Sequence, residues 1–185
     1  MSLSLRSRPH EQLRAELLLW RAGGVVIGVL AIVGVLQAIL WSLIAPGEQF
    51  LVYTDGTYLP LPTESYHQFT SIAIFTLIGV VVAISAATLT WHWRTVRGTV
   101  MVLVVAGANG IGALVAYLVG RVLASGVDPA SVGPASATSV AHAAPTLGNA
   151  MVLLIQPGVA VVVYTFLIAW NGSPDLGRVM PPPEA

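Results

Sequence analysis

Long apolar stretches dominate the chain, and the short segments between them carry its charged residues. Four of these stretches are each close to the roughly 20 residues that an α-helix needs to cross about 30 Å of hydrocarbon. None of the four contains Asp, Glu, Lys or Arg. Because a backbone within lipid must satisfy its own hydrogen bonds, the pattern predicts four transmembrane helices, at residues 22–44, 69–91, 99–120 and 151–170. The predicted fold class is therefore an all-α membrane protein, a four-helix transmembrane bundle formed by residues 22–170.

The segment before the first span has an amphipathic pattern. Leu13, Leu17 and Trp20 recur at helical spacing, with polar residues on the other faces. We expect residues 1–21 to include a short helix at the membrane surface that continues into the first span. The apolar run starts only after Arg21 and is longer than the hydrophobic region of a signal peptide, about 7–15 residues, so we expect an uncleaved span.

The arginines predict the orientation of the bundle. Seven of the eight fall on one side of the predicted spans, and only Arg121 falls on the other. The positive-inside rule assigns the arginine-rich side to the cytoplasm. Both termini, including the tail 171–185, are then cytoplasmic, and the exterior loops are 45–68 and 121–150. The predicted location is the plasma (inner) membrane. The seven arginines are Arg6, Arg8, Arg14, Arg21, Arg94, Arg97 and Arg178.

The two exterior loops differ in pattern. In the first, the β-prone runs 50–53 and 57–59 flank Asp55 and Gly56. An Asp-Gly pair between such runs predicts a β-hairpin, because the turn needs a positive φ that glycine adopts freely. An isolated hairpin is only marginally stable, so it must pack on the bundle, the second loop or a partner chain. The second loop is rich in Ala, Ser, Gly and Pro, and we expect it to bury little apolar area and stay mobile.

Small residues form stripes at helical spacing within two of the spans. In lipid, small side chains let helices approach closely and gain packing contacts. The stripes serve either to pack the chain's own helices or to dock a partner subunit or a second copy. They are Gly24 and Gly28 in the first span, and Ala108, Gly112, Ala116 and Gly120 in the third.

Three amide side chains lie within the predicted spans: Gln37, Asn109 and Gln156. We expect them to form hydrogen bonds between helices, worth roughly 0.6–2 kcal/mol each. Pro157 and Gly158 follow the last amide and should break the helix in mid-span. A kink beside a polar side chain is also typical of transporter helices, so a solute pathway is the alternative to a structural role.

The chemistry of an enzyme or a cofactor site is not visible in the sequence. Glu64, His67 and Arg121 form a candidate exterior polar cluster, but two potential ligands make no metal site. If the three converged, an intramembrane enzyme would have to be considered. There is no cysteine, and no nucleophile or nucleotide-binding motif outside the membrane. The net charge of zero argues against nucleic-acid binding. We expect no catalytic residue, metal or cofactor.

Two short motifs suggest a family. The first span ends in Leu-Trp-Ser-Leu-Ile-Ala-Pro-Gly at 40–47, and Ser-Pro-Asp-Leu-Gly follows the fourth span at 173–177. With the four-span layout, these resemble a family of actinobacterial membrane proteins classed as a domain of unknown function. The resemblance covers roughly residues 17–177 and implies an actinobacterial plasma membrane, without an activity or ligand.

These observations favour a non-enzymatic accessory subunit or scaffold of an inner-membrane complex, serving respiration or the cell envelope. The expected partners are membrane lipid and other integral membrane subunits or a second copy. The alternative is a small-molecule transporter or channel that works as an oligomer.

Overall fold

Four long helices form the body of the molecule in the computed structural model, which describes residues 9–61, 64–124, 126–127, 131 and 139–172. All four, the last together with the short helical turn that precedes it, are long and apolar enough to cross a membrane, as the sequence predicts. The last one is preceded by a short 3₁₀ helix, η2. The bounds are α1 Pro9–Ile44, α2 Glu64–His92, α3 Thr99–Leu123, η2 Ala150–Leu154 and α4 Ile155–Trp170.

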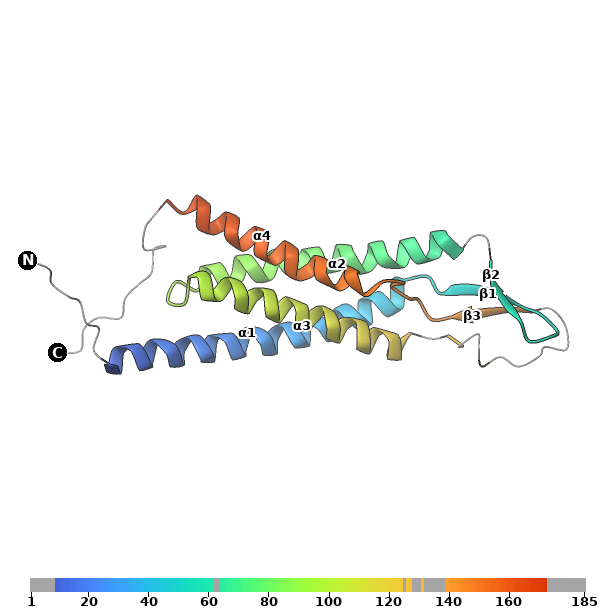
Figure 1. The fold of residues 1–185 in the computed structure, drawn as a ribbon, viewed down its shortest axis with the longest axis horizontal. Coiled ribbons are helices and arrows are strands. Elements are labelled where there is room, and N and C mark those ends of the chain that lie inside the picture. Colours follow the sequence, from blue (N-terminus) through green and yellow to red (C-terminus); the bar gives the residue numbers. More distant parts are fainter. Residues whose placement is uncertain (1–8, 62–63, 125, 128–130, 132–138, 173–185) are drawn as a thin grey trace, which may run out of the picture.

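Helices α1 and α3 run in one direction and α2 and α4 in the other (Figure 1). The α2–α3 turn, the start of α1 and the end of α4 lie at one end of the bundle, called here the turn end; a small sheet lies at the other, the sheet end. The most extensive packing joins α1 to α3, followed by α2 to α4 and α3 to α4. By contrast, α1 and α2 contact each other little, although they are consecutive helices.

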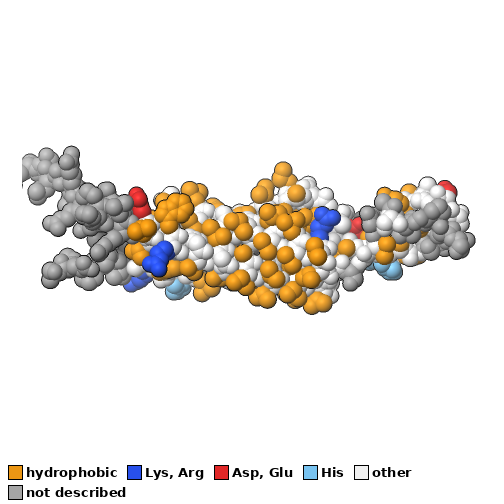
Figure 2. Space-filling model, turned by 90° about the horizontal axis from the view of Figure 1, so that it is seen from below, with side chains coloured by type: hydrophobic (Ala, Val, Ile, Leu, Met, Phe, Trp, Pro, Cys, Tyr) orange, Lys and Arg blue, Asp and Glu red, His pale blue; other side chains and the backbone are white. Residues whose placement is uncertain are grey.

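Small side chains line many of the contacts between the helices, and many large apolar side chains face outward, although Trp41, Phe75 and Tyr164 are buried. Leu36, Leu103 and Val162 are each at least 60% exposed, and Figure 2 shows hydrophobic side chains over most of the helical body. This distribution suits a bundle surrounded by lipid, where an outward leucine costs nothing and association depends on close packing. Fully buried alanines line the contacts: Ala38, Ala83, Ala87, Ala108, Ala113, Ala116 and Ala160.

Helices α1 and α3 approach each other closely at a glycine-to-glycine crossing. A Cβ on Gly34 would collide with the backbone carbonyl of Gly112. A Cβ on Gly112 would lie 2.9 Å from the carbonyl oxygen of Leu30. Such a contact is closer than real Cβ atoms allow, so only glycine lets the two backbones meet here.

Toward the sheet end, Trp41 joins α1 to two other helices. Its indole Nε1 donates to the backbone carbonyl of Ser71 at 3.1 Å, and its ring packs edge-on against Phe75 with centroids 5.6 Å apart. A Cβ on Gly120 would lie 2.6 Å from the indole ring, so this glycine makes room for it. The indole is fully buried and its donor is satisfied, as a buried tryptophan requires.

The predicted hairpin is confirmed as β1 Glu48–Val52 and β2 Tyr58–Pro60, paired antiparallel. Gly56 adopts the positive φ, at 82°, and its N–H donates to the carbonyl of Tyr53. The hydroxyl and the N–H of Thr57 donate to one Asp55 carboxylate oxygen at 2.6 and 2.9 Å. The hydroxyl hydrogen bond, together with the N–H bond, holds the pKa of Asp55 below its ordinary value.

The expectation of a mobile second loop is wrong for its last part. Residues Ser139–Ala143 form β3, which pairs antiparallel with β1 and makes a three-stranded sheet in the order β2-β1-β3. The second loop is thus the element on which the hairpin packs. The composition hid this strand because alanine and serine have low β-propensity. Most of the alanine- and serine-rich stretch that precedes β3 lies outside the described residues.

The helix break near Pro157 is at a different place from the predicted one. The 3₁₀ helix η2 ends at Leu154 and α4 begins at Ile155, so the proline occupies the first turn of α4 instead of its middle. Proline is tolerated in a first turn because the N–H it lacks has no partner within the helix. Residues 9–21, which the sequence assigns to a surface helix, are continuous with the first span in α1.

Substituting Gly34 with Ala should separate α1 from α3 and cost about 1–3 kcal/mol, the usual range for overpacking. Thermal unfolding of the purified protein in mild detergent measures this. Gly107→Ala in α3 is the matched control, since this glycine is exposed and a Cβ there meets nothing within 4 Å. Equal midpoints for the two variants would contradict the crossing.

Candidate functional site

The three intramembrane amides converge on one point in the bundle. Gln37 of α1, Asn109 of α3 and Gln156 of α4 are each at least 97% buried, with exposures of 2%, 0% and 3%. Gln156 Nε2 donates to Asn109 Oδ1 at 3.2 Å, and Asn109 Nδ2 donates to the carbonyl of Val105 at 2.9 Å. The sequence identified these residues one by one, and the structure brings them together from three helices as the amide cluster.

The fourth helix contributes a glycine to the amide cluster. A Cβ on Gly79 of α2 would lie 3.1 Å from Gln156 Oε1 and 3.5 Å from Gln37 Nε2. An acceptor and a donor from different helices therefore face the same small space. An alanine at Gly79 would press on Gln156 Oε1 and reach ordinary van der Waals contact with Gln37 Nε2.

Part of the hydrogen-bonding capacity of the amide cluster is not used within the described part of the chain. Gln37 Nε2, Gln37 Oε1 and Gln156 Oε1 are buried and have no partner among the described residues. A buried amide group without a hydrogen-bond partner costs about 1–3 kcal/mol, so these atoms lower the stability of the folded chain. Together they offer donors and acceptors without charge, which suits a small neutral molecule such as water.

The two glycine stripes lie in different environments. Ala108, Gly112, Ala116 and Gly120 are all buried on the face of α3 that packs in the bundle. Gly24 and Gly28 are exposed on the outside of α1, and a Cβ on either meets nothing within 4 Å. We call this pair the glycine face. The bundle itself makes no use of it.

At the turn end, a buried arginine forms a contact that the sequence analysis missed. Arg97 is only 6% exposed, its Nε donates to the carbonyl of Trp91 at 2.6 Å, and its guanidinium stacks 4.2 Å from the centroid of that indole. Trp91 in turn packs edge-on against the buried Tyr164 of α4. Burial, and then the charge of Arg94, lowers the pKa of Arg97 from its ordinary value. The two tryptophans of the Trp-His-Trp run at 91–93, close to arginines in the same turn, are the sequence feature from which a cation–π contact could have been predicted.

The exterior polar cluster of Glu64, His67 and Arg121 stays a prediction. The side chain of Glu64 lies outside the described residues. Arg121 is exposed and places its guanidinium 5.6 Å from the ring centroid of Tyr117, one turn earlier in α3. Within the described part of the chain, no three His, Asp or Glu side chains gather closely enough to hold a metal ion.

Comparison with known proteins gives the family. The family model described as "Protein of unknown function (DUF2567)" matches residues 30–178. The chain belongs to this family. This DUF2567 chain is 34% identical over 168 residues to an uncharacterized protein of Mycobacterium bovis. The aligned region covers 80% of this chain and 86% of the relative. Identity and coverage are the same for an uncharacterized protein of Mycobacterium tuberculosis (strain ATCC 25618 / H37Rv).

A further relative of this DUF2567 protein is an uncharacterized protein of Mycobacterium leprae, 32% identical over 171 residues, covering 83% of this chain and 86% of the relative. No solved structure matches the chain. The predicted resemblance to four-span actinobacterial membrane proteins of unknown function is confirmed by the family match and by these mycobacterial relatives.

The amide cluster predicts that replacing each of its two glutamines with leucine has a different effect on stability. Gln156→Leu removes the donor to Asn109 Oδ1 and should cost about 0.6–2 kcal/mol. Gln37→Leu removes buried atoms that have no partner among the described residues, so stability should be unchanged or higher. Thermal unfolding in detergent distinguishes the two. A Gln37→Leu variant as unstable as Gln156→Leu would show that Gln37 is bonded.

Proposed function

We propose that this chain is a non-enzymatic accessory subunit or scaffold of a membrane complex. It binds a partner helix at the glycine face of α1, within the membrane, and a second partner surface at the sheet. The chain holds its own fold with α1–α3 and α2–α4 packing and leaves these two surfaces for other proteins.

The glycine face is the observation that carries this proposal. Glycine is costly in a helix, by about 1 kcal/mol relative to alanine, and Gly34, Gly112 and Gly120 repay that cost by close contacts inside the bundle. Gly24 and Gly28 make no such contact. Some other glycines make none either, but this pair lies four residues apart on one exposed face of a helix. Glycines four residues apart on an outward face let a second helix approach its backbone closely, which is how helices associate in lipid.

An apolar row across the sheet supports the same proposal. Leu51 of β1 is directly opposite Leu59 of β2 on one side and Val140 of β3 on the other, so the three side chains share a face. Leu59 is 57% and Val140 50% exposed. Exposed apolar side chains in a row across a sheet are typical of a protein contact surface.

The proposed orientation places the turn end in the cytoplasm and the sheet outside the plasma membrane of an actinobacterium. Four arginines of the described part belong to segments at or near the turn end, namely Arg14, Arg21, Arg94 and Arg97, whereas Arg121 is at the sheet end. The positive-inside rule then favours this direction. The sheet would meet partners that face the cell envelope, and α1 would meet membrane subunits of an envelope or respiratory complex.

The protein with Gly24→Ile and Gly28→Ile should lose its partner. Solubilised in mild detergent, the wild-type protein should have a native mass above that of one chain, from a co-purifying subunit or a second copy. The double variant should run as a monomer, because two β-branched side chains hold a partner helix away. Native mass spectrometry of both preparations measures this.

Gly107→Ile with Gly158→Ile is the matched control, since both glycines are exposed and a Cβ on either meets nothing within 4 Å. Its native mass should equal that of the wild type. A wild-type protein that is a lone monomer, with nothing co-purifying, would contradict the proposed function.

A small-molecule transporter or channel is the second candidate, and the amide cluster favours it. The unused donors and acceptors lie inside the membrane region and come from more than one helix, as in sites for polar solutes. Because these groups are uncharged, the solute would be small and neutral. The cluster is closed on all sides in this conformation, so such a role requires helix movement or an oligomer.

For this second candidate, glycerol and urea are suitable probes in stopped-flow swelling of proteoliposomes. Asn109→Leu should abolish protein-dependent flux, because it removes the central amide, while the fold, followed by circular dichroism, is retained. Flux that is unchanged in the variant, or absent from the wild type, would rule the transporter out.

A further inference from the structure

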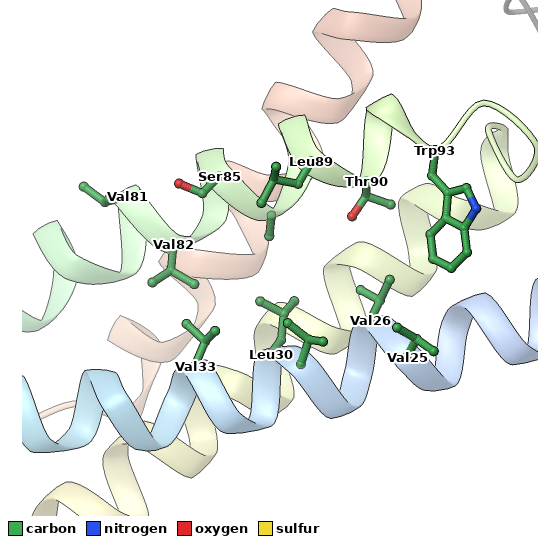
Figure 3. A pocket seen from close by; sticks show the side chains of 12 residues that line it. Val25, Val26, Leu30, Val33, Val81, Val82, Ser85, Leu89, Thr90 and Trp93 are labelled. Carbon is green, nitrogen blue, oxygen red and sulfur yellow. The ribbon is translucent and has the colours of Figure 1, made fainter.

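An open groove runs along the outside of the bundle between α1 and α2, where the two helices contact each other little. Its volume is about 400 Å³, within the range of small-molecule sites. Figure 3 shows Val25 and Val33 of α1 on one wall, Val82 and Leu89 of α2 on the other, and Trp93 at one end. Ser85 and Thr90 are the polar residues of the lining, so the groove is almost wholly apolar.

The groove continues into a basic pocket at the turn end. Val25 and Trp93 line both the groove and this second pocket, whose volume is about 240 Å³. The pocket adds Arg21 and Thr95. The guanidinium of Arg21 is exposed, and so is Arg94 in the adjacent turn. The apolar groove thus ends at a cation beside an indole, a combination of residues typical of the membrane interface.

We propose that this composite groove binds one anionic phospholipid, with an acyl chain between α1 and α2 and its phosphate at Arg21. The apolar walls match a hydrocarbon chain, and the guanidinium at the mouth matches a phosphate, to which arginine donates two hydrogen bonds. Basic pockets between membrane helices bind anionic headgroups for the same reason.

A partner helix is a poorer match for the groove than a lipid chain. The walls are mostly branched or long side chains, whereas helices that dock closely in lipid use small ones. The glycine face, which does have that character, lies one residue away on α1, since Gly24 precedes Val25 and Gly28 precedes Val29. One residue is about 100° around a helix, so the two surfaces point in different directions. The lipid site is therefore separate from the proposed partner surface.

Native mass spectrometry of the full chain in mild detergent tests the site, with dimyristoyl phosphatidylglycerol and dimyristoyl phosphatidylcholine as probes. The wild type should retain one phosphatidylglycerol in preference to phosphatidylcholine. Arg21→Gln should weaken phosphatidylglycerol binding about fivefold, the effect of one surface arginine on an anionic lipid. Val29→Phe should reduce binding of both lipids, because it fills the groove.

Each variant has a matched control. Arg121→Gln removes an exposed arginine at the other end of the bundle, and Val35→Phe enlarges an exposed valine of α1 that does not line the groove. Both should bind lipid as the wild type does. Equal retention of the two lipids by the wild type, or equal losses in Arg21→Gln and Arg121→Gln, would overturn the proposal. So would a protein dimer that Val29→Phe dissociates, since the occupant would then be a second copy.

Discussion

The structure depends on how closely α1 can approach α3. At their crossing, Gly34 and Gly112 bring the two backbones together, with no room for a Cβ on either. This contact sets the relative position of the helices, and the amide cluster follows from it, because Gln37 lies one turn beyond Gly34 and Asn109 one turn before Gly112. It also explains the groove. With α1 held against α3, α2 packs mainly on α4 and leaves a gap beside α1.

Much of this architecture can be predicted from the sequence, because the bilayer imposes simple rules. The four spans follow from apolar length, and the hairpin from the Asp55-Gly56 turn, whose glycine has the positive φ that the sequence requires. The β3 strand could not be predicted, since its serine and alanine residues carry no strand signal and it forms only because β1 offers an open edge. The predicted position of the helix break near Pro157 was wrong because a proline is as compatible with the first turn of a helix as with a kink in its middle.

The candidate sites show the same division. The sequence identified Gln37, Asn109 and Gln156 as intramembrane amides, but periodicity gives only the face of a helix and cannot say which faces meet. Nor could it distinguish the glycine stripes. Ala108 and Gly112 are buried against the bundle, whereas Gly24 and Gly28 face outward, although the spacing is identical. The structure thus distinguishes the glycines that pack inside the bundle from those that a partner could contact. It also shows that the amide side chains lie inside the bundle, whereas the apolar groove and Arg21 lie on its outside.

The α1–α3 crossing is tested most directly in the native membrane by disulfide cross-linking. The chain contains no cysteine, so pairs can be introduced without background. Leu30 of α1 and Ala108 of α3 belong to one buried cluster, whereas Ile32 is 65% exposed on the outside of α1. Cysteines at positions 30 and 108 should cross-link within the chain on mild oxidation, and cysteines at 32 and 108 should not. Efficient cross-linking of the 32–108 pair, with none for 30–108, would show that α1 meets α3 by another face and would contradict this account.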